Sequence, residues 1–279
     1  MFFTRFLILT LFISFIFSRG ILLQADTEKN TKITKSTEMI EMRDGIRLAT
    51  DIYKPLIGKP WPALIIRTPY GKNGFSLGIE GVNLTEIFPT LMGCVVIIQD
   101  TRGRHDSEGV DSIFLDNGWG DRQDGYDAIE WAADQEWCDG NVGIIGPSAM
   151  GINAYLAAGA MPPSLKCLIA IVAASDLYHQ AAYWNGCYRN ELVDGWIHSL
   201  NADHMFDFIQ KHPLYDDLWK MYNYENRITL FHLPGLHIGG WHDCFSQGNL
   251  NAFMMSAPSE DQYIIMGPWT HSKTMTDFQ

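Results

Sequence analysis

The stretch Asn141-Val-Gly-Ile-Ile-Gly-Pro-Ser-Ala-Met-Gly151 decides how this chain folds. A short apolar run leads into Gly-Pro-Ser, and an Ala-rich helical pattern follows at residues 152–160, so the stretch predicts a strand, a sharp turn and a helix. Glycines lie two residues before Ser148 and three residues after it, where a side chain would meet the neighbouring strand or helix. A turn between strand and helix exposes a serine hydroxyl, which makes Ser148 a candidate nucleophile.

Apolar runs on both sides of this stretch predict further buried strands. A hairpin is expected at residues 36–55 around the turn Arg43-Asp44-Gly45, and helical patterns at 121–134 and after Ser148 alternate with the runs. The single-strand runs lie at residues 63–67, 94–99, 142–145, 168–172, 236–238 and 263–266. Continuous apolar strands alternating with helices predict a doubly wound, mostly parallel α/β sheet.

Residues 173–228 differ in amino-acid composition from the rest of the chain. They are rich in Trp, Tyr, His, Asn and Asp and lack strand-like runs, and residues 191–210 are expected to be helical. Because connections between strands and helices are normally short, we expect an inserted helical cap here, with residues 36–172 and 229–279 forming the core. Ordinary crossover helices are the alternative.

The charge of the chain argues against two classes of binding partner, and its N-terminal segment indicates the cellular location. The chain has 279 residues, 47% of them hydrophobic, and a net charge of −12, which argues against binding to nucleic acid or to an anionic membrane surface. Residues 1–25 are expected to be a signal peptide, because residues 6–17 form an apolar run that is too short for an ordinary membrane span. A secreted or periplasmic protein is predicted, with an uncleaved membrane anchor as the alternative.

The chain has five cysteines, an odd number, and no C-x-x-C pair. The sequence therefore predicts neither a zinc motif nor a redox motif. Cys94 and Cys167 lie in apolar runs and are expected to be buried packing residues.

A serine nucleophile needs a base, and the base needs an orienting acid. Two downstream segments, at residues 236–243 and 264–271, each have an apolar strand, a break containing glycine and then polar candidates. The first segment contains His237, His242 and Asp243, and the second ends at His271. A histidine within a strand is usually structural, so His237 is expected to be structural.

Six blocks of sequence resemble those of one family, the X-Pro dipeptidyl-peptidase and cocaine esterase-like (CocE/NonD) serine hydrolases. Together they extend over about residues 38–272 in the family's order. The blocks are Met42-Arg-Asp-Gly-Ile-Arg-Leu-Ala-Thr-Asp-Ile-Tyr53, Arg67-Thr-Pro-Tyr-Gly-Lys72, Gln99-Asp-Thr-Arg-Gly-Arg-His-Asp-Ser-Glu-Gly109, the run from Asp124-Gly-Tyr-Asp-Ala-Ile-Glu-Trp131 through Gln135-Glu-Trp137 to Gly140-Asn-Val-Gly143, Gly240-Trp-His-Asp243 and Gly267-Pro-Trp-Thr-His-Ser272.

The resemblance implies an α/β-hydrolase fold and a Ser-Asp-His triad made of Ser148, Asp243 and His271. It also implies that the hydroxyl of Tyr70 donates to the oxyanion, and the backbone N–H of Ala149, the residue after the nucleophile, is expected to be the second donor. The family usually has Tyr where this chain has Ala149, which changes the wall of the pocket. Such a mechanism requires no metal or organic cofactor.

Other polar residues of these blocks have structural explanations. Asp176, at the start of the cap, is expected to be structural rather than a substrate contact. Arg102, Arg104 and Asp106 are expected to form buried ion pairs that fix their loop, rather than an anion site.

The expected reaction is cleavage of an ester or amide through an acyl-enzyme. Relatives that select amino esters place carboxylates just after the acid, whereas Cys244-Phe-Ser-Gln247 follows here, which favours a neutral acyl group. Aromatic residues of the cap suggest an apolar pocket, with Trp184 and Trp196 as candidate substrate contacts. An X-Pro dipeptidyl aminopeptidase and a catalytically impaired binding protein are the alternatives, and oligomerisation is left open.

The family resemblance also implies a C-terminal β jelly-roll domain after the catalytic histidine. The chain ends eight residues after His271, so we expect that domain to be absent.

Overall fold

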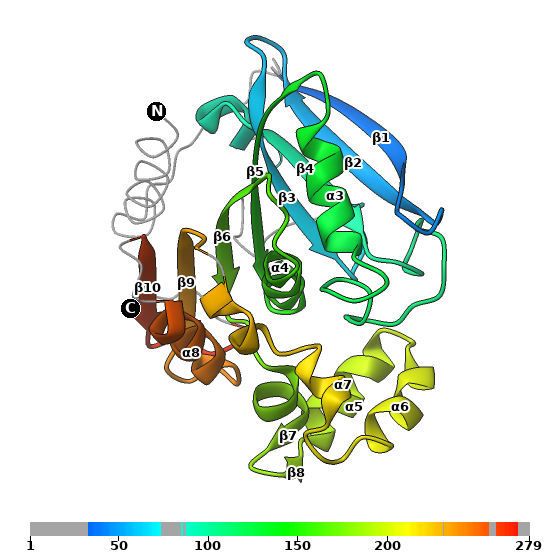
Figure 1. The fold of residues 1–279 in the computed structure, drawn as a ribbon, viewed down its shortest axis with the longest axis vertical. Helices are drawn as coiled ribbons and strands as arrows, with labels where there is room; N and C mark the ends of the chain where they lie inside the picture. The colour runs from blue at the N-terminus through cyan, green and yellow to red at the C-terminus, as the bar shows by residue number, and fades with distance from the viewer. Residues whose placement is uncertain (1–32, 74–84, 86–87, 231, 257–260, 273–279) are drawn as a thin grey trace.

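The centre of the molecule is an eight-stranded sheet (Figure 1), seen in a computed structural model that describes residues 33–73, 85, 88–230, 232–256 and 261–272. The strand order is β1-β2-β4-β3-β5-β6-β9-β10. The hairpin of β1 (Ile33–Glu41) and β2 (Arg47–Pro55) is antiparallel and pairs antiparallel with β4. The other strands are mutually parallel, and they are β3 (Trp61–Thr68), β4 (Val95–Asp100), β5 (Cys138–Pro147), β6 (Leu165–Ile171), β9 (Gly235–Gly240) and β10 (Gln262–Gly267). The predicted mostly parallel sheet is confirmed.

Successive side chains of a strand point to opposite faces of the sheet. In the central strands both sets of side chains are buried, so both faces of the sheet are covered. On β3, Ala63 and Ile65 pack in one apolar cluster, whereas Leu64 and Ile66 pack in another. The first cluster lies under the helices α3 (Asp124–Ala133) and α4 (Ala149–Gly159), which Figure 1 shows in front of the sheet. Burial on both faces is the physical reason that these strands appear in the sequence as unbroken apolar runs.

The cap leaves the sheet after β6 and returns at β9, and in Figure 1 its helices gather beyond one end of the sheet. Its elements are η2 (Leu177–Ala182), β7 (Tyr183–Trp184), β8 (Cys187–Tyr188), α5 (Asn190–Ser199), η3 (Asp203–Met205), α6 (Phe206–Gln210), α7 (Asp217–Lys220), η4 (Tyr224–Asn226) and, at its end, η5 (Ile228–Leu230). The helix α8 (Ser246–Ser256) follows β9 and packs on β9 and β10.

The cap differs from the expectation in two details. Residues 191–210 are helical, as expected, except for a break at residues 200–202, where Asn201 has a φ of 54°, a left-handed conformation that ends α5. The cap also contains a two-residue hairpin, β7–β8, whose turn is Asn185-Gly186. Both turn residues have positive φ, as an Asn-Gly hairpin turn requires, and this dipeptide is a sequence signal that the prediction overlooked.

The loop after β4 is held by ion pairs. Arg102, whose side chain is 4% exposed, donates to Asp44 in the β1–β2 turn and to Asp124 at the start of α3. Arg104 pairs with Asp111. The expected buried ion pairs are therefore present at the two arginines. The third predicted member, Asp106, is exposed instead and pairs with the buried ammonium of Lys72 at 2.5 Å.

Asp176 is structural, as expected. Its carboxylate accepts hydrogen bonds from the backbone N–H groups of Tyr178 and His179 at the start of η2, and from the side-chain amide of Asn223. These bonds join the two ends of the cap. The predicted signal peptide lies outside the described residues, and in the part of the chain that is described no helix combines the length and the apolar character needed to cross a bilayer.

Candidate active site

Ser148 occupies the turn between β5 and α4 in a strained conformation. Its φ of 54° and ψ of −126° are uncommon for a residue with a side chain. Two glycines make this turn possible. A Cβ on Gly146 would lie 2.4 Å from the backbone of the first turn of α4, and one on Gly151 would lie 2.7 Å from the Cβ of Ala173. The turn therefore requires glycine at both positions.

The three residues expected to form a triad meet at one end of the sheet. The Oγ of Ser148 lies 2.8 Å from Nε2 of His271, and Nδ1 of His271 lies 2.7 Å from Oδ1 of Asp243. Asp243 follows β9 and His271 follows β10, which are parallel neighbours, so their carboxyl ends lie at the same edge. The side chain of Asp243 is fully buried, whereas that of His271 is about one-third exposed.

The surroundings of His271 favour its protonated form. Burial by itself lowers the pKa of the imidazole, but hydrogen bonds with Asp243 and with Cys244 outweigh burial, so the pKa of His271 is raised above its ordinary value of 6.5. The ring also packs edge-on against Phe245, with centroids 5.3 Å apart. The second oxygen of Asp243, Oδ2, is buried without a hydrogen-bond partner among the described residues.

The other two histidines of these segments have different surroundings. His237 is buried within β9, where its Nδ1 lies 2.8 Å from the hydroxyl of Tyr155 and its Nε2 lies 3.2 Å from Gln262. Burial lowers the pKa of His237 to about 4, so this imidazole is neutral and structural, as predicted. His242 is exposed beside Asp243.

Tyr70 follows β3, and its hydroxyl faces the nucleophile. The indole Nε1 of Trp196, on α5, donates to this hydroxyl at 2.8 Å. Because an indole N–H only donates, the phenol oxygen must accept there, which leaves the phenol's own proton for another acceptor. Burial raises the pKa of Tyr70, and its hydrogen bonds with Trp196 and Ser148 act in the opposite direction. Ala149 begins α4, where the first backbone N–H groups have no partner within the helix.

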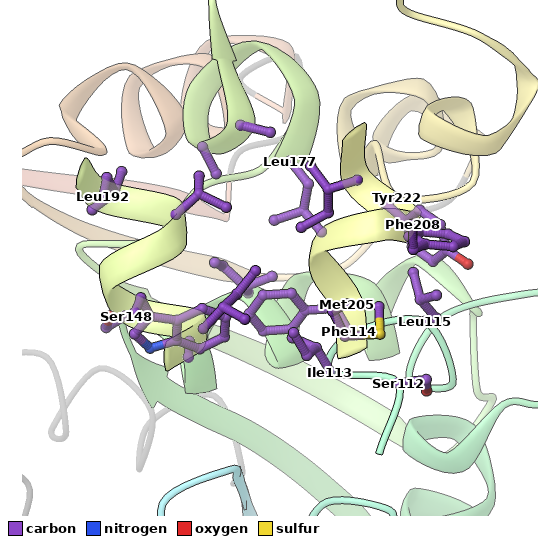
Figure 2. A pocket seen from close by; sticks show the side chains of 18 of the residues that line it. Ser112, Ile113, Phe114, Leu115, Ser148, Leu177, Leu192, Met205, Phe208 and Tyr222 are labelled. Carbon is purple, nitrogen blue, oxygen red and sulfur yellow. The ribbon is translucent and has the colours of Figure 1, made fainter. Parts of the chain in front are cut away.

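A cavity of about 200 Å³ lies between Ser148 and the cap. Figure 2 shows its side chains converging from the cap and from the loop that precedes α3. Trp196 stacks on Phe114 with centroids 5.4 Å apart. The lining contains no Asp, Glu, Lys or Arg, and consists of Ser112, Ile113, Phe114, Leu115, Ser148, Ala149, Ile152, Leu177, Ala181, Ala182, Leu192, Val193, Trp196, Ile197, Met205, Phe208, Ile209, Trp219, Tyr222, Phe245 and His271.

Of the two candidate substrate contacts, Trp196 lines this cavity and Trp184 does not. Trp184 lies outside the lining, because the β7–β8 hairpin carries it to the surface, where it is 46% exposed and stacks with the guanidinium of Arg189. The wall made by residues 112–115 was missed, since no pattern in that loop indicates that it approaches Ser148.

A further cluster was also missed. Cys244 follows Asp243 directly, and one ligand atom each of Asp243, Cys244 and His271 lies within 4.8 Å of the others. Cys94 and Cys167, in contrast, are buried as predicted, and burial raises the pKa of each thiol to about 12.

A mostly parallel sheet with a serine at a strained turn from strand to helix defines the α/β-hydrolase fold. A sequence model of the X-Pro dipeptidyl-peptidase (S15 family) matches residues 44–207 and 198–273. The chain belongs to this family.

Similarity to individual proteins supports the family through one curated relative and the fold through solved structures. Cocaine esterase of Rhodococcus sp. (strain MB1 Bresler) is 30% identical over 285 residues, with 85% of this chain and 49% of the relative covered. A CocE/NonD family hydrolase from Staphylococcus aureus superposes with a TM-score of 0.74 at 24% identity, over 88% of this chain and 48% of that one. An α-amino acid ester hydrolase has a TM-score of 0.71 at 20% identity, over 92% and 52% of the two chains. This chain spans about half the length of these relatives.

Proposed function

We propose that this chain is a serine hydrolase that cleaves ester or amide bonds by transferring an acyl group to water. The proposal depends on one observation, the continuous hydrogen-bonded series from Asp243 through His271 to Ser148 at a strained turn. Nucleophile, base and orienting acid are the parts that acyl transfer through a covalent intermediate needs. Membership of a family named for a peptidase, and similarity to an esterase, support the same class of reaction.

In the proposed mechanism, His271 accepts the proton of Ser148 as Oγ attacks the substrate carbonyl. Tyr70 and the backbone N–H of Ala149 donate to the developing oxyanion, and Trp196 holds the phenol so that its proton faces the site. His271 then donates a proton to the leaving group, and water releases the acyl group by the same steps. These steps use only groups of this chain and water.

The proposed substrates have a compact, neutral, apolar acyl group. An apolar cavity of about 150 Å³ binds benzene, so the cavity of about 200 Å³ has room for a benzoyl group or a short acyl chain. An X-Pro dipeptide presents an ammonium group, and burying that charge without a carboxylate partner is costly. The lining offers no carboxylate, which favours esters over such peptides.

A panel of p-nitrophenyl esters assayed beside Gly-Pro-p-nitroanilide tests this function. We expect turnover of the esters, with the highest kcat/KM for benzoyl or similarly sized acyl groups, and none of the dipeptide anilide. Ser148→Ala is expected to abolish both turnover and labelling by a fluorophosphonate. Full activity of that variant would contradict the mechanism, and faster cleavage of the anilide would favour the aminopeptidase.

We also propose that residues 1–25 direct export of the protein. Their short apolar run between Arg5 and Arg19 supports this, because it has the length of a signal-peptide core. Mass spectrometry of the exported protein is expected to find an N-terminus near Asp26. An intact Met1 in a membrane fraction would indicate an anchor instead.

A further inference from the structure

The active site contains a cluster of side chains in which one member, Cys244, has no role in the proposed hydrolysis. Asp243 and Cys244 leave β9 side by side, and His271 approaches them from the end of β10. One ligand atom from each lies within 4.8 Å of the other two, and no other group of His, Cys, Asp or Glu among the described residues is gathered in this way. Cys244 is half-buried, and its hydrogen bond with the imidazole of His271 helps to raise the pKa of that ring.

A second observation concerns the carboxylate. The side chain of Asp243 is fully buried, and its Oδ2 has no hydrogen-bond partner among the described residues. A buried acceptor without a partner is costly, and native proteins rarely leave one. This oxygen belongs to the carboxylate of Asp243, one of whose oxygens lies in the cluster with the thiol and the imidazole.

The three donors suit one kind of ion. Thiolate sulfur and imidazole nitrogen select zinc rather than magnesium or calcium, and three protein ligands plus water complete a tetrahedron. Zinc lies about 2.3 Å from sulfur and about 2.1 Å from nitrogen, so ligand atoms around it are roughly 3.5 Å apart. Separations of up to 4.8 Å would have to shrink by about 1 Å, a change on the scale of a side-chain rotation at the half-buried Cys244, and Nδ1 of His271 and Oδ1 of Asp243, 2.7 Å apart, would have to separate if both coordinate the ion.

We propose that Asp243, Cys244 and His271 form an inhibitory Zn²⁺ site. A ring nitrogen of His271 that coordinates zinc is no longer available for proton transfer or for the bond with Asp243, so a bound ion stops the reaction. Binding of zinc does not depend on the proposed hydrolase function, whereas inhibition does. Cys244 is the ligand that separates this site from an ordinary Ser-His-Asp arrangement.

Binding is tested without any enzyme assay. Calorimetry of the full chain is expected to show one Zn²⁺ bound, and Co²⁺ is expected to give a thiolate-to-cobalt charge-transfer band. Cys244→Ser should remove the band and weaken zinc binding by about 100-fold or more, since even the hydrogen-bonding partners of zinc ligands are worth roughly 10–100-fold in affinity. Cys187→Ser is the matched control, because Cys187 is an exposed thiol on β8 that is not a member of the cluster, and it should leave both signals unchanged. Equal zinc affinity in wild type and Cys244→Ser would overturn the proposal.

The consequence for activity is tested with a p-nitrophenyl ester. Zinc is expected to inhibit the wild-type chain, EDTA to restore it, and Cys244→Ser to need about 100-fold more zinc for the same fractional inhibition. Equal sensitivity of the variant would overturn the inhibitory role of Cys244. A chain that binds zinc through Cys244 but cleaves no ester would contradict the proposed function and leave the metal site supported.

Discussion

Each group of the hydrogen-bonded series at Ser148 determines what its neighbour can do. Asp243 accepts from Nδ1 of His271, which leaves Nε2 to accept the proton of the serine hydroxyl. Sequence alone indicated Ser148 and two segments that contain possible partners, because strands that end in polar residues are visible as patterns. It did not indicate the bond between Tyr70 and Trp196, since those residues lie 126 positions apart and neither belongs to a pattern that involves the other.

The raised pKa of His271 predicts the pH dependence of activity. The imidazole must be neutral to accept a proton, so activity is lost as the pH falls through the pKa of the folded protein. Because the pKa of His271 is raised above 6.5, the acidic limb of the profile of kcat/KM is expected at a pH above 6.5.

Asp243→Asn should move that limb to lower pH, because it removes the carboxylate that stabilises the imidazolium. It should also lower kcat by roughly 10⁴-fold, as the equivalent change does in a chymotrypsin-type triad. Measuring kcat/KM for a p-nitrophenyl ester from pH 5 to 10 compares the two proteins, and a limb at the same pH in both would be evidence against His271 as the base.

Trp196→Phe separates the positioning of Tyr70 from binding in the pocket. Phenylalanine keeps a ring beside Phe114 but loses the N–H that donates to Tyr70. We expect kcat to fall roughly 3- to 10-fold with little change in KM, because a single neutral hydrogen bond contributes about 1 kcal/mol. Tyr70→Phe, which removes the donor itself, should cost about 10²–10³ in kcat. A change confined to KM in Trp196→Phe would mean that Trp196 contacts substrate without orienting Tyr70.

At the scale of elements, the strands were predictable and the internal structure of the cap was not. All six residues of β4 are buried, and the first four of them form an unbroken apolar run, Val95-Val-Ile-Ile98. The end of α5 depends on the left-handed Asn201, and the wall at residues 112–115 depends on how a loop packs beneath the cap. The end of α5 is decided locally, by the left-handed Asn201 and the hydrogen bond from the backbone N–H of Ala202 to the carbonyl of Ile197, a signal that the prediction overlooked. The wall has no repeating pattern, because it is decided by contacts between segments far apart in the chain.

Gly151→Ala is expected to disturb the contact between α4 and the sheet. The added methyl group would lie 2.7 Å from both the Cβ of Ala173 and the carbonyl oxygen of Gly146, so α4 must shift at the turn that holds Ser148. We expect the free energy of unfolding to fall by about 1–3 kcal/mol, with a loss of activity. Gly195→Ala in α5 is the control, because a methyl group there would have no neighbour within 4 Å, and alanine should stabilise the helix by about 0.5–1 kcal/mol. Urea denaturation measures both, and an unchanged stability of Gly151→Ala would show that α4 tolerates the methyl group.

At the scale of the whole molecule, ion pairs connect the hairpin at one edge of the sheet to the loop after β4 and to the start of α3. Arg102 lies in the loop after β4, and its guanidinium joins Asp44 of the hairpin turn to Asp124 at the start of α3. Burial raises the pKa of Asp124, and the hydrogen bonds with Arg102 oppose that effect. The hydrogen bonds with Arg102 therefore favour the ionised form of Asp124, which burial disfavours.

Arg102→Ala is expected to lower the free energy of unfolding by about 3 kcal/mol, because it removes both hydrogen bonds of Arg102 to the buried carboxylate of Asp124 and leaves only the guanidinium of Arg67, 3.8 Å away, to balance that charge. Arg102→Ala combined with Asp124→Asn should cost less than the sum of the two single changes, since the two side chains are in direct contact and their effects are coupled. Arg47→Ala is the matched control, because Arg47 pairs with Glu108 on the exposed side of the same hairpin and should change stability little. Urea denaturation of Arg102→Ala, Asp124→Asn, the double variant and Arg47→Ala measures these changes in the free energy of unfolding. If Arg102→Ala were as mild as Arg47→Ala, the Arg102 ion pairs would contribute little to holding the hairpin, the loop after β4 and α3 together, and the other contacts, such as the pair of Arg43 with Asp127, would carry that role.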